Sequence, residues 1–119
     1  MRIVATDLAF RRNSSAAVAL CVEGRQVRVL DVGEWVPKYA PLVPSVVCRE
    51  MAQMAVRHKC THMAGDSHYR DTAIEHAREA GLGWRDIPSS EDYTDASLLR
   101  LRTLVLEKRI LLPKHELLL

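Results

Sequence analysis

Residues 1–7 read MRIVATD, a short run rich in β-branched side chains that ends on an aspartate. This pattern predicts a β-strand with Asp7 at its carboxyl end. Residues 15–22 form a second apolar run, and the turn at Glu23-Gly24-Arg25 leads to alternating apolar and polar residues over 26–36. The amino-terminal part of the chain is therefore predicted to be an antiparallel meander of three strands.

The rest of the sequence alternates between helical and extended patterns. Apolar residues recur at helical spacing over 43–58, after three prolines have interrupted the preceding pattern. The expected elements that follow are a strand over 60–64, a helix over 71–80, a strand over 83–87, and a helix over 96–108 that residues 109–112 leave. This order predicts an α/β fold in which a mixed sheet of antiparallel and parallel strands carries helices on both faces.

Length and composition favour one globular domain over residues 1–119, because 48% of the residues are hydrophobic and 27% are charged. The net charge of +2 gives no whole-molecule field that would favour or exclude nucleic acid. Residues 117–119 are all leucine, which suggests either a domain cut from a longer protein or a self-association contact at the carboxyl-terminal end.

Neither a membrane span nor a signal peptide fits the sequence, so a cytoplasmic protein with no membrane partner is expected. The cysteines are Cys21, Cys48 and Cys60, which are odd in number and lack a CxxC spacing. They lie inside apolar segments and are predicted to be buried reduced thiols.

The sharpest chemical feature is a pair of aspartates at predicted strand ends. Asp7 ends the first strand and Asp66 follows the fourth. If those strands are neighbours, the two carboxylates can share a divalent cation, since hard cations such as Mg²⁺ prefer oxygen ligands. The alternative is that each aspartate only forms a turn through side-chain to backbone hydrogen bonds.

Several stretches together resemble the nuclease domain of phage large terminases, which has the ribonuclease H-like fold shared with Holliday-junction resolvases and retroviral-type integrases. They are MRIVATD at 1–7, the hairpin through Gly24, AGDSHY at 64–69, and LLRLRTLVLEKRILLP at 98–113. The resemblance covers almost the whole chain. It implies a hydrolase that cuts double-stranded DNA during viral genome packaging, in the cytoplasm of the host, with one or two Mg²⁺ or Mn²⁺ ions held by Asp7 and Asp66.

The resemblance also implies protein partners and a third metal ligand that this sequence does not supply at the expected position. The partners would be an ATPase domain and other packaging proteins, because the chain contains no GxxxxGK[ST] motif of its own. Such nuclease domains take a third acidic ligand from a helix that would follow Leu119. Asp92, Asp95 and Glu116 are acidic but do not match that position, so the site is expected to be either incomplete or built unconventionally.

Contacts to the DNA backbone are predicted for Arg11 and Arg12, which follow Asp7, and for His68, which lies two residues after Asp66. A second basic group, consisting of Arg100, Arg102, Lys108 and Arg109, is interpreted as a solvated helix face that could also meet phosphates. A catalytically silent module that binds DNA or protein and a resolvase- or integrase-like nuclease remain as alternative functions.

Other polar residues are assigned no role in the chemistry. The alternation of His58, Cys60 and His62 is compatible with zinc ligands, but no fourth ligand has matching spacing. Asp31 is predicted to be a solvated residue of the third strand.

Overall fold

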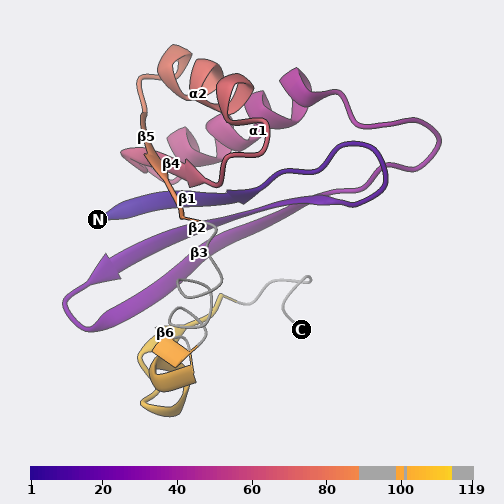
Figure 1. The fold of residues 1–119 in the computed structure, drawn as a ribbon. Coiled ribbons are helices and arrows are strands. Elements are labelled where there is room, and N and C mark those ends of the chain that lie inside the picture. The colour runs from indigo at the N-terminus through magenta and orange to yellow at the C-terminus, as the bar shows by residue number, and fades with distance from the viewer. Residues whose placement is uncertain (89–98, 101, 114–119) are drawn as a thin grey trace.

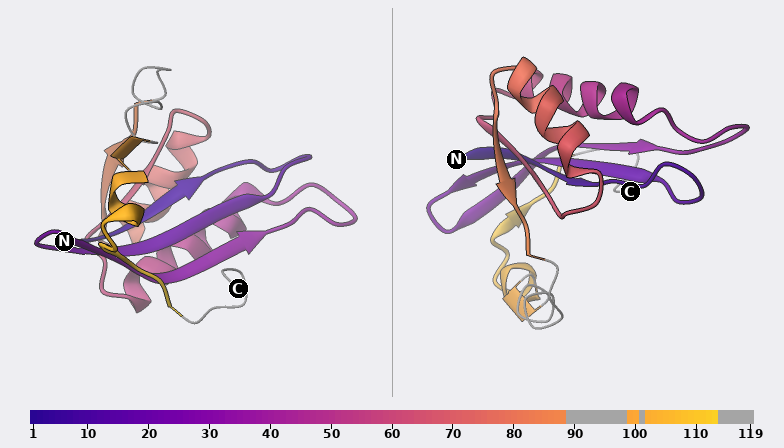
Figure 2. Two further views of the ribbon diagram at one scale, coloured as in Figure 1. Left: turned by 90° about the horizontal axis from the view of Figure 1, so that it is seen from below. Right: turned by 45° about the horizontal axis from the view of Figure 1, so that its top comes forward.

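The structure is a computed structural model that describes residues 1–88, 99–100 and 102–113. Two helices cover one face of a mixed sheet, and helical residues 102–106 lie on the other side of it (Figures 1 and 2). The elements are β1 (Arg2–Asp7), β2 (Ser15–Glu23), β3 (Gln26–Trp35), α1 (Pro44–Arg57), β4 (His62–Gly65), α2 (Arg70–Glu79), β5 (Gly83–Asp86) and β6 (Ile110–Leu111).

Strand order in the described part of the chain is β5-β4-β1-β2-β3-β6. The β1–β2 and β2–β3 pairs are antiparallel, whereas β4 and β5 join the sheet as parallel neighbours on the β1 side. The predicted meander, the two later strands and the predicted α/β fold class are confirmed. Residues 109–112 hold a further short strand, because Ile110 and Leu111 pair in parallel with Val27 and Arg28 of β3.

Helix α1 begins at a proline, with no side chain capping its first turn. Proline is suited to this position because its fixed φ is helical and its missing N–H would have no intrahelical acceptor. The helix buries Val47, Met51 and Met54 against the sheet, as the apolar spacing predicts. Helix α2 packs beside α1 and buries Ala73 and Ala77.

Side-chain alternation separates the two faces of the sheet. Val4 of β1 and its partners Ala19 and Met63 are fully buried in the core beneath α1. Because successive strand residues point to opposite faces, Ile3, Ala5 and Asp7 lie on the face away from α1 and α2.

All three cysteines are buried and none forms a disulfide. Burial raises the pKa of the Cys48 thiol to about 11 and also raises the pKa of Cys60. Both thiols are therefore protonated at neutral pH and act as small apolar core groups. No helix in the described residues is both long enough and apolar enough to cross a membrane.

Asp31 is not the solvated strand residue that the sequence analysis predicted. Its side chain is only 21% exposed, and its Oδ2 lies 2.9 Å from Nε2 of His58, the residue that follows α1. Arg57 lies 3.4 Å from the same oxygen, and Oδ1 accepts the Val32 backbone N–H at 2.8 Å. Burial alone would raise the pKa of Asp31, but these hydrogen bonds outweigh it and the pKa is lowered.

Replacing Asp31 with asparagine is expected to lower the free energy of unfolding by about 1–2 kcal/mol at neutral pH, since charge-assisted hydrogen bonds that link β3 to the end of α1 are weakened. A lowered native pKa stabilises the fold above the unfolded-state pKa of about 3.9 and ceases to do so as the pH falls through the native value. Urea unfolding should show the gap between the two proteins narrowing below about pH 4. A gap that stays constant down to low pH would contradict this role.

Candidate active site

Strand pairing aligns the two aspartates singled out in the sequence. Strands β1 and β4 run parallel, with Ile3 opposite His62 and Ala5 opposite Ala64. Asp7 is the last residue of β1 and Asp66 directly follows β4, so extending this register by two residues would place them opposite one another at the carboxyl ends of the two strands. Neighbouring strands lie about 4.8 Å apart, so two carboxylates in this register are within reach of one cation.

Asp66 also has the turn role that was the alternative. Its Oδ1 accepts the backbone N–H of His68 at 2.9 Å, and its Oδ2 lies 3.3 Å from Nδ1 of the same residue. The Asp66 side chain is 32% exposed, and that of His68 is 72% exposed. The turn thus holds the carboxylate in place at the end of β4, with an exposed imidazole beside it.

Gly65, the residue before Asp66, meets a tight packing requirement. A Cβ at this position would lie 2.5 Å from Oγ1 of Thr6 and 3.0 Å from Cη2 of Trp84. Only glycine therefore permits β4 to lie this close to its neighbours without a shift. The Thr6 hydroxyl donates to the carbonyl of Ala64 at 2.9 Å, which ties together the ends of β1 and β4 that carry the aspartates.

The loop that follows Asp7 is anchored at both sides. Phe10 is 4% exposed and its ring meets that of Tyr69 edge-on, with centroids 4.5 Å apart. Ser15 is fully buried, accepts the backbone N–H of Ala9 at 3.0 Å and donates to the carbonyl of Ala9. The ring pair joins the β1–β2 loop to the loop after β4, and the Ser15 hydrogen bonds hold the β1–β2 loop to the start of β2.

The predicted DNA-contacting residues lie on these two joined loops. Arg11 and Arg12 are exposed on the first, between the anchors at Phe10 and Ser15. His68 is on the second, next to Tyr69. The two loops that carry Arg11, Arg12 and His68 therefore begin at the carboxyl ends of β1 and β4, where the aspartates lie.

Pairing adds residues that the sequence analysis did not single out. Exposed Glu34 lies opposite Ala16, which in turn pairs with Asp7, so Glu34 is in the same row and on the same face. Exposed Arg85 pairs with Ala64 and therefore also shares the face of Asp7. No local signal marks these residues, because their position depends on strand order and register.

Among the described residues, no three histidine, cysteine, aspartate or glutamate side chains lie together so that they could hold a metal. The two aspartates therefore have no third acidic ligand within this part of the chain. Asp86 ends β5 but pairs with Gly65, so it faces the side of α2, where Arg70 lies 3.3 Å away. The other acids considered from the sequence, and the apolar residues 117–119, lie outside the described residues. These acids are Asp92, Asp95 and Glu116.

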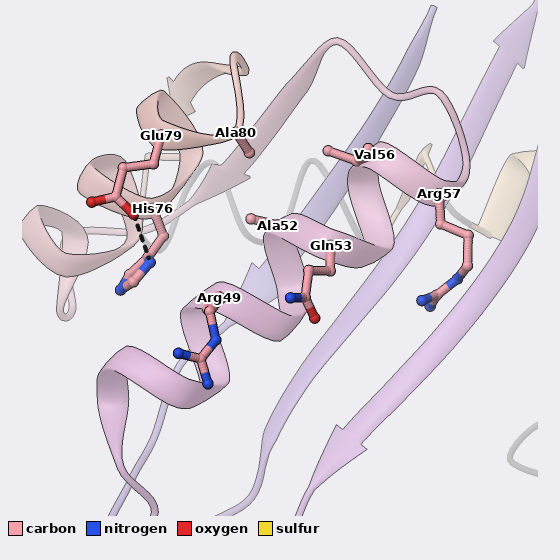
Figure 3. A pocket seen from close by; sticks show the side chains of 8 residues that line it. All are labelled: Arg49, Ala52, Gln53, Val56, Arg57, His76, Glu79 and Ala80. Atoms are coloured by element: carbon pink, nitrogen blue, oxygen red, sulfur yellow. Dashed lines mark ion pairs between the residues drawn. The ribbon is translucent and has the colours of Figure 1, made fainter.

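A groove between α1 and α2 is separate from this edge (Figure 3). Ala52, Val56 and Ala80 form its apolar lining, and Arg49 and Arg57 project beside it from α1. It lies on the helical side of the sheet, whereas Asp7 of β1 faces the other side.

Comparison with solved structures finds the same fold in phage large terminases and in RuvC. The large terminase nuclease of thermophilic phage G20c superposes with a TM-score of 0.75 at 11% sequence identity, covering 98% of this chain and 60% of that one. The large terminase of bacteriophage HK97 gives a TM-score of 0.75 at 17% identity, covering 96% and 30% of the two chains. RuvC of Thermus thermophilus matches with a TM-score of 0.58 at 15% identity, covering 72% and 60%.

The chain thus spans less than two thirds of the length of each of these proteins. No protein-family model and no curated protein matches the sequence. The resemblance noted from the sequence is therefore confirmed at the level of the fold. The chain has the ribonuclease H-like fold, in the form found in the nuclease domains of phage large terminases.

Proposed function

We propose that the chain is a divalent-metal-dependent endonuclease domain that cleaves double-stranded DNA, as part of a viral genome-packaging terminase. The observation that supports this proposal is the parallel pairing of β1 with β4, which makes the strand that Asp7 ends the neighbour of the strand that Asp66 follows. This pairing occurs in a fold shared with terminase nucleases and RuvC.

The donor chemistry at the strand ends suits Mg²⁺ or Mn²⁺. Asp7 and Asp66 offer carboxylate oxygens, the ligands that these hard cations prefer, and Asp66 is held by the backbone N–H of His68. One or two such ions would activate a water for in-line attack on the phosphodiester and stabilise charge on the leaving oxygen. The two carboxylates would position the cation, and any further acidic ligand would come from outside the described residues.

The basic side chains around the aspartates would hold the duplex. Arg11 and Arg12 are placed to contact backbone phosphates beside Asp7, and His68 to contact one beside Asp66. These contacts position DNA without reading its sequence. In a packaging complex the domain would act with an ATPase domain and other packaging proteins in the host cytoplasm.

The direct test is cleavage of duplex DNA by the purified chain in Mn²⁺, in Mg²⁺ and in EDTA. The proposal predicts cutting that requires a divalent ion and stops in EDTA. Equal cutting in EDTA would indicate a metal-independent or contaminating activity, and no cutting in either metal would favour the second candidate below.

The second candidate is a catalytically silent module that binds DNA or protein. It is favoured by one observation, the lack of a three-acid cluster within the described residues. Two carboxylates hold Mg²⁺ weakly, because each anionic ligand lost removes charge that offsets dehydration of the cation. Duplex binding without cleavage in either metal would support this candidate.

A further inference from the structure

A cleft separate from the aspartate edge lies between the β2–β3 turn and the helical segment that precedes β6. It has a volume of about 370 Å³. Its described lining residues are Val22, Gly24, Arg25, Val27, Arg100, Leu104 and Arg109, none of which is acidic. We call it the arginine cleft after Arg25, Arg100 and Arg109.

The three arginines come from separate segments of the chain and converge only in the folded structure. Arg25 is exposed in the β2–β3 turn, and Arg100 is exposed in the helical segment. Arg109 is 26% exposed and is held in place, because its carbonyl accepts the Val27 backbone N–H at 2.7 Å and its Nε lies 3.0 Å from Oε2 of Glu107. These contacts hold Arg109 in position at the side of the cleft.

The chemistry of this cleft favours phosphate. Guanidinium groups present planar sets of N–H donors that match phosphate oxygens. Because Arg109 is already paired with Glu107, the positive charge available to a ligand comes mainly from Arg25 and Arg100. A cleft with apolar walls also focuses the field of its charges. The sequence analysis allowed Arg100 and Arg109 to meet phosphates but did not group Arg25 with them, because Arg25 joins them only through the fold.

The arginine cleft and Asp7 lie at opposite ends of β2. Val22 and Val27 pair with each other, and Val22 lies on the same face of β2 as Ala16, the partner of Asp7. The row of Ala16 and the turn at Gly24 are eight residues apart along an extended strand, or roughly 27 Å. This length corresponds to about eight base pairs of a duplex, close to one helical turn.

We propose that the arginine cleft binds backbone phosphates of the same DNA duplex, about eight base pairs from the point held by Asp7 and Asp66. The proposal rests on the proposed function, since it takes duplex DNA as the ligand. The arginine cleft holds the duplex at one end of β2. Asp7 and Asp66 hold the metal ion for cleavage at the other end.

The test is binding of a duplex of about 30 base pairs, long enough to pass both sites, measured by fluorescence anisotropy in EDTA so that cleavage is absent. The double variant Arg25→Ala/Arg100→Ala is compared with wild type and with Arg49→Ala, which removes an exposed arginine from α1 on the other side of the sheet. We expect about a tenfold loss of affinity for the double variant only, and a salt dependence shallower by about two.

Footprinting of the bound duplex locates the contact. Wild type should protect backbone positions about eight base pairs from the segment nearest Asp7, and the double variant should lose this protection while keeping the rest. Unchanged affinity and unchanged protection in the double variant would overturn the proposal. The proposal would also be overturned if the double variant lost binding of inorganic phosphate while its affinity for DNA stayed unchanged. That result would identify a site for the free anion.

These outcomes are independent of catalysis. If wild type fails to cleave in any metal but the double variant still loses DNA affinity, the proposed nuclease activity fails and the arginine cleft stands. Matching thermal unfolding of the variants confirms that the exposed substitutions leave the fold intact.

Discussion

Mn²⁺-dependent cleavage of duplex DNA is expected to fall at least about a thousandfold when Asp7 is replaced by asparagine. The substitution preserves the size of the side chain and removes its negative charge. Asp7 is exposed at the end of β1 and no described core contact depends on it, so the fold should persist. The loss arises because Asp66 alone offsets too little of the cost of dehydrating the cation.

The matched control is Glu75→Gln, which removes one negative charge from an exposed position on α2. It should cleave at the wild-type rate. Initial rates measured over a range of Mn²⁺ concentrations separate weak metal binding from lost chemistry, since excess metal restores the rate only in the first case. Undiminished cleavage by the Asp7→Asn protein would remove Asp7 from the site.

Replacing Phe10 with alanine is expected to lower the free energy of unfolding by about 3–5 kcal/mol, a large part of the stability of a small domain. Phe10 is 4% exposed in the core, its ring packs against Tyr69, and its carbonyl accepts the backbone N–H of Leu42 at 2.7 Å. Alanine would leave a cavity at the base of the loop that carries Arg11 and Arg12. Urea unfolding followed by circular dichroism measures this cost.

Two further variants separate the core contribution of Phe10 from the ring contact. Phe10→Leu retains most of the buried volume and should cost about 1 kcal/mol. Tyr69→Leu removes the same ring pair from a side chain that is 48% exposed, and should also cost about 1 kcal/mol. An alanine variant no less stable than Tyr69→Leu would show that Phe10 does not anchor the loop through the core.

The sequence predicted those features that local patterns determine. The β-branched run before Asp7 and the apolar spacing before residue 58 identify β1 and α1 with little error. Asp7 and Asp66 were found because aspartates after short strands stand out locally. The structure confirms that the first and fourth strands are neighbours, as predicted. The alignment of the two aspartates is inferred by extending this pairing.

The missed features depend on tertiary contacts. A strand as short as Ile110–Leu111 has no periodicity of its own and exists through its pairing with β3. Asp31 is half-buried because α1 ends above it, which strand alternation alone does not reveal. Arg85 and Glu34 share the face of Asp7 through strand register. Arg25 lines the same cleft as Arg109 only because β6 returns to the edge of β3.

The most direct test of the central claim is a crystal of this protein soaked in Mn²⁺ and measured for anomalous scattering. The account predicts an anomalous peak between the carboxylates of Asp7 and Asp66, with metal–oxygen distances of roughly 2.1–2.3 Å and any further acidic ligand visible in the same shell. Asp7→Asn crystals should lose the peak. A wild-type crystal with no peak at this edge, and with Asp66 hydrogen bonded only within its turn, would contradict the nuclease assignment.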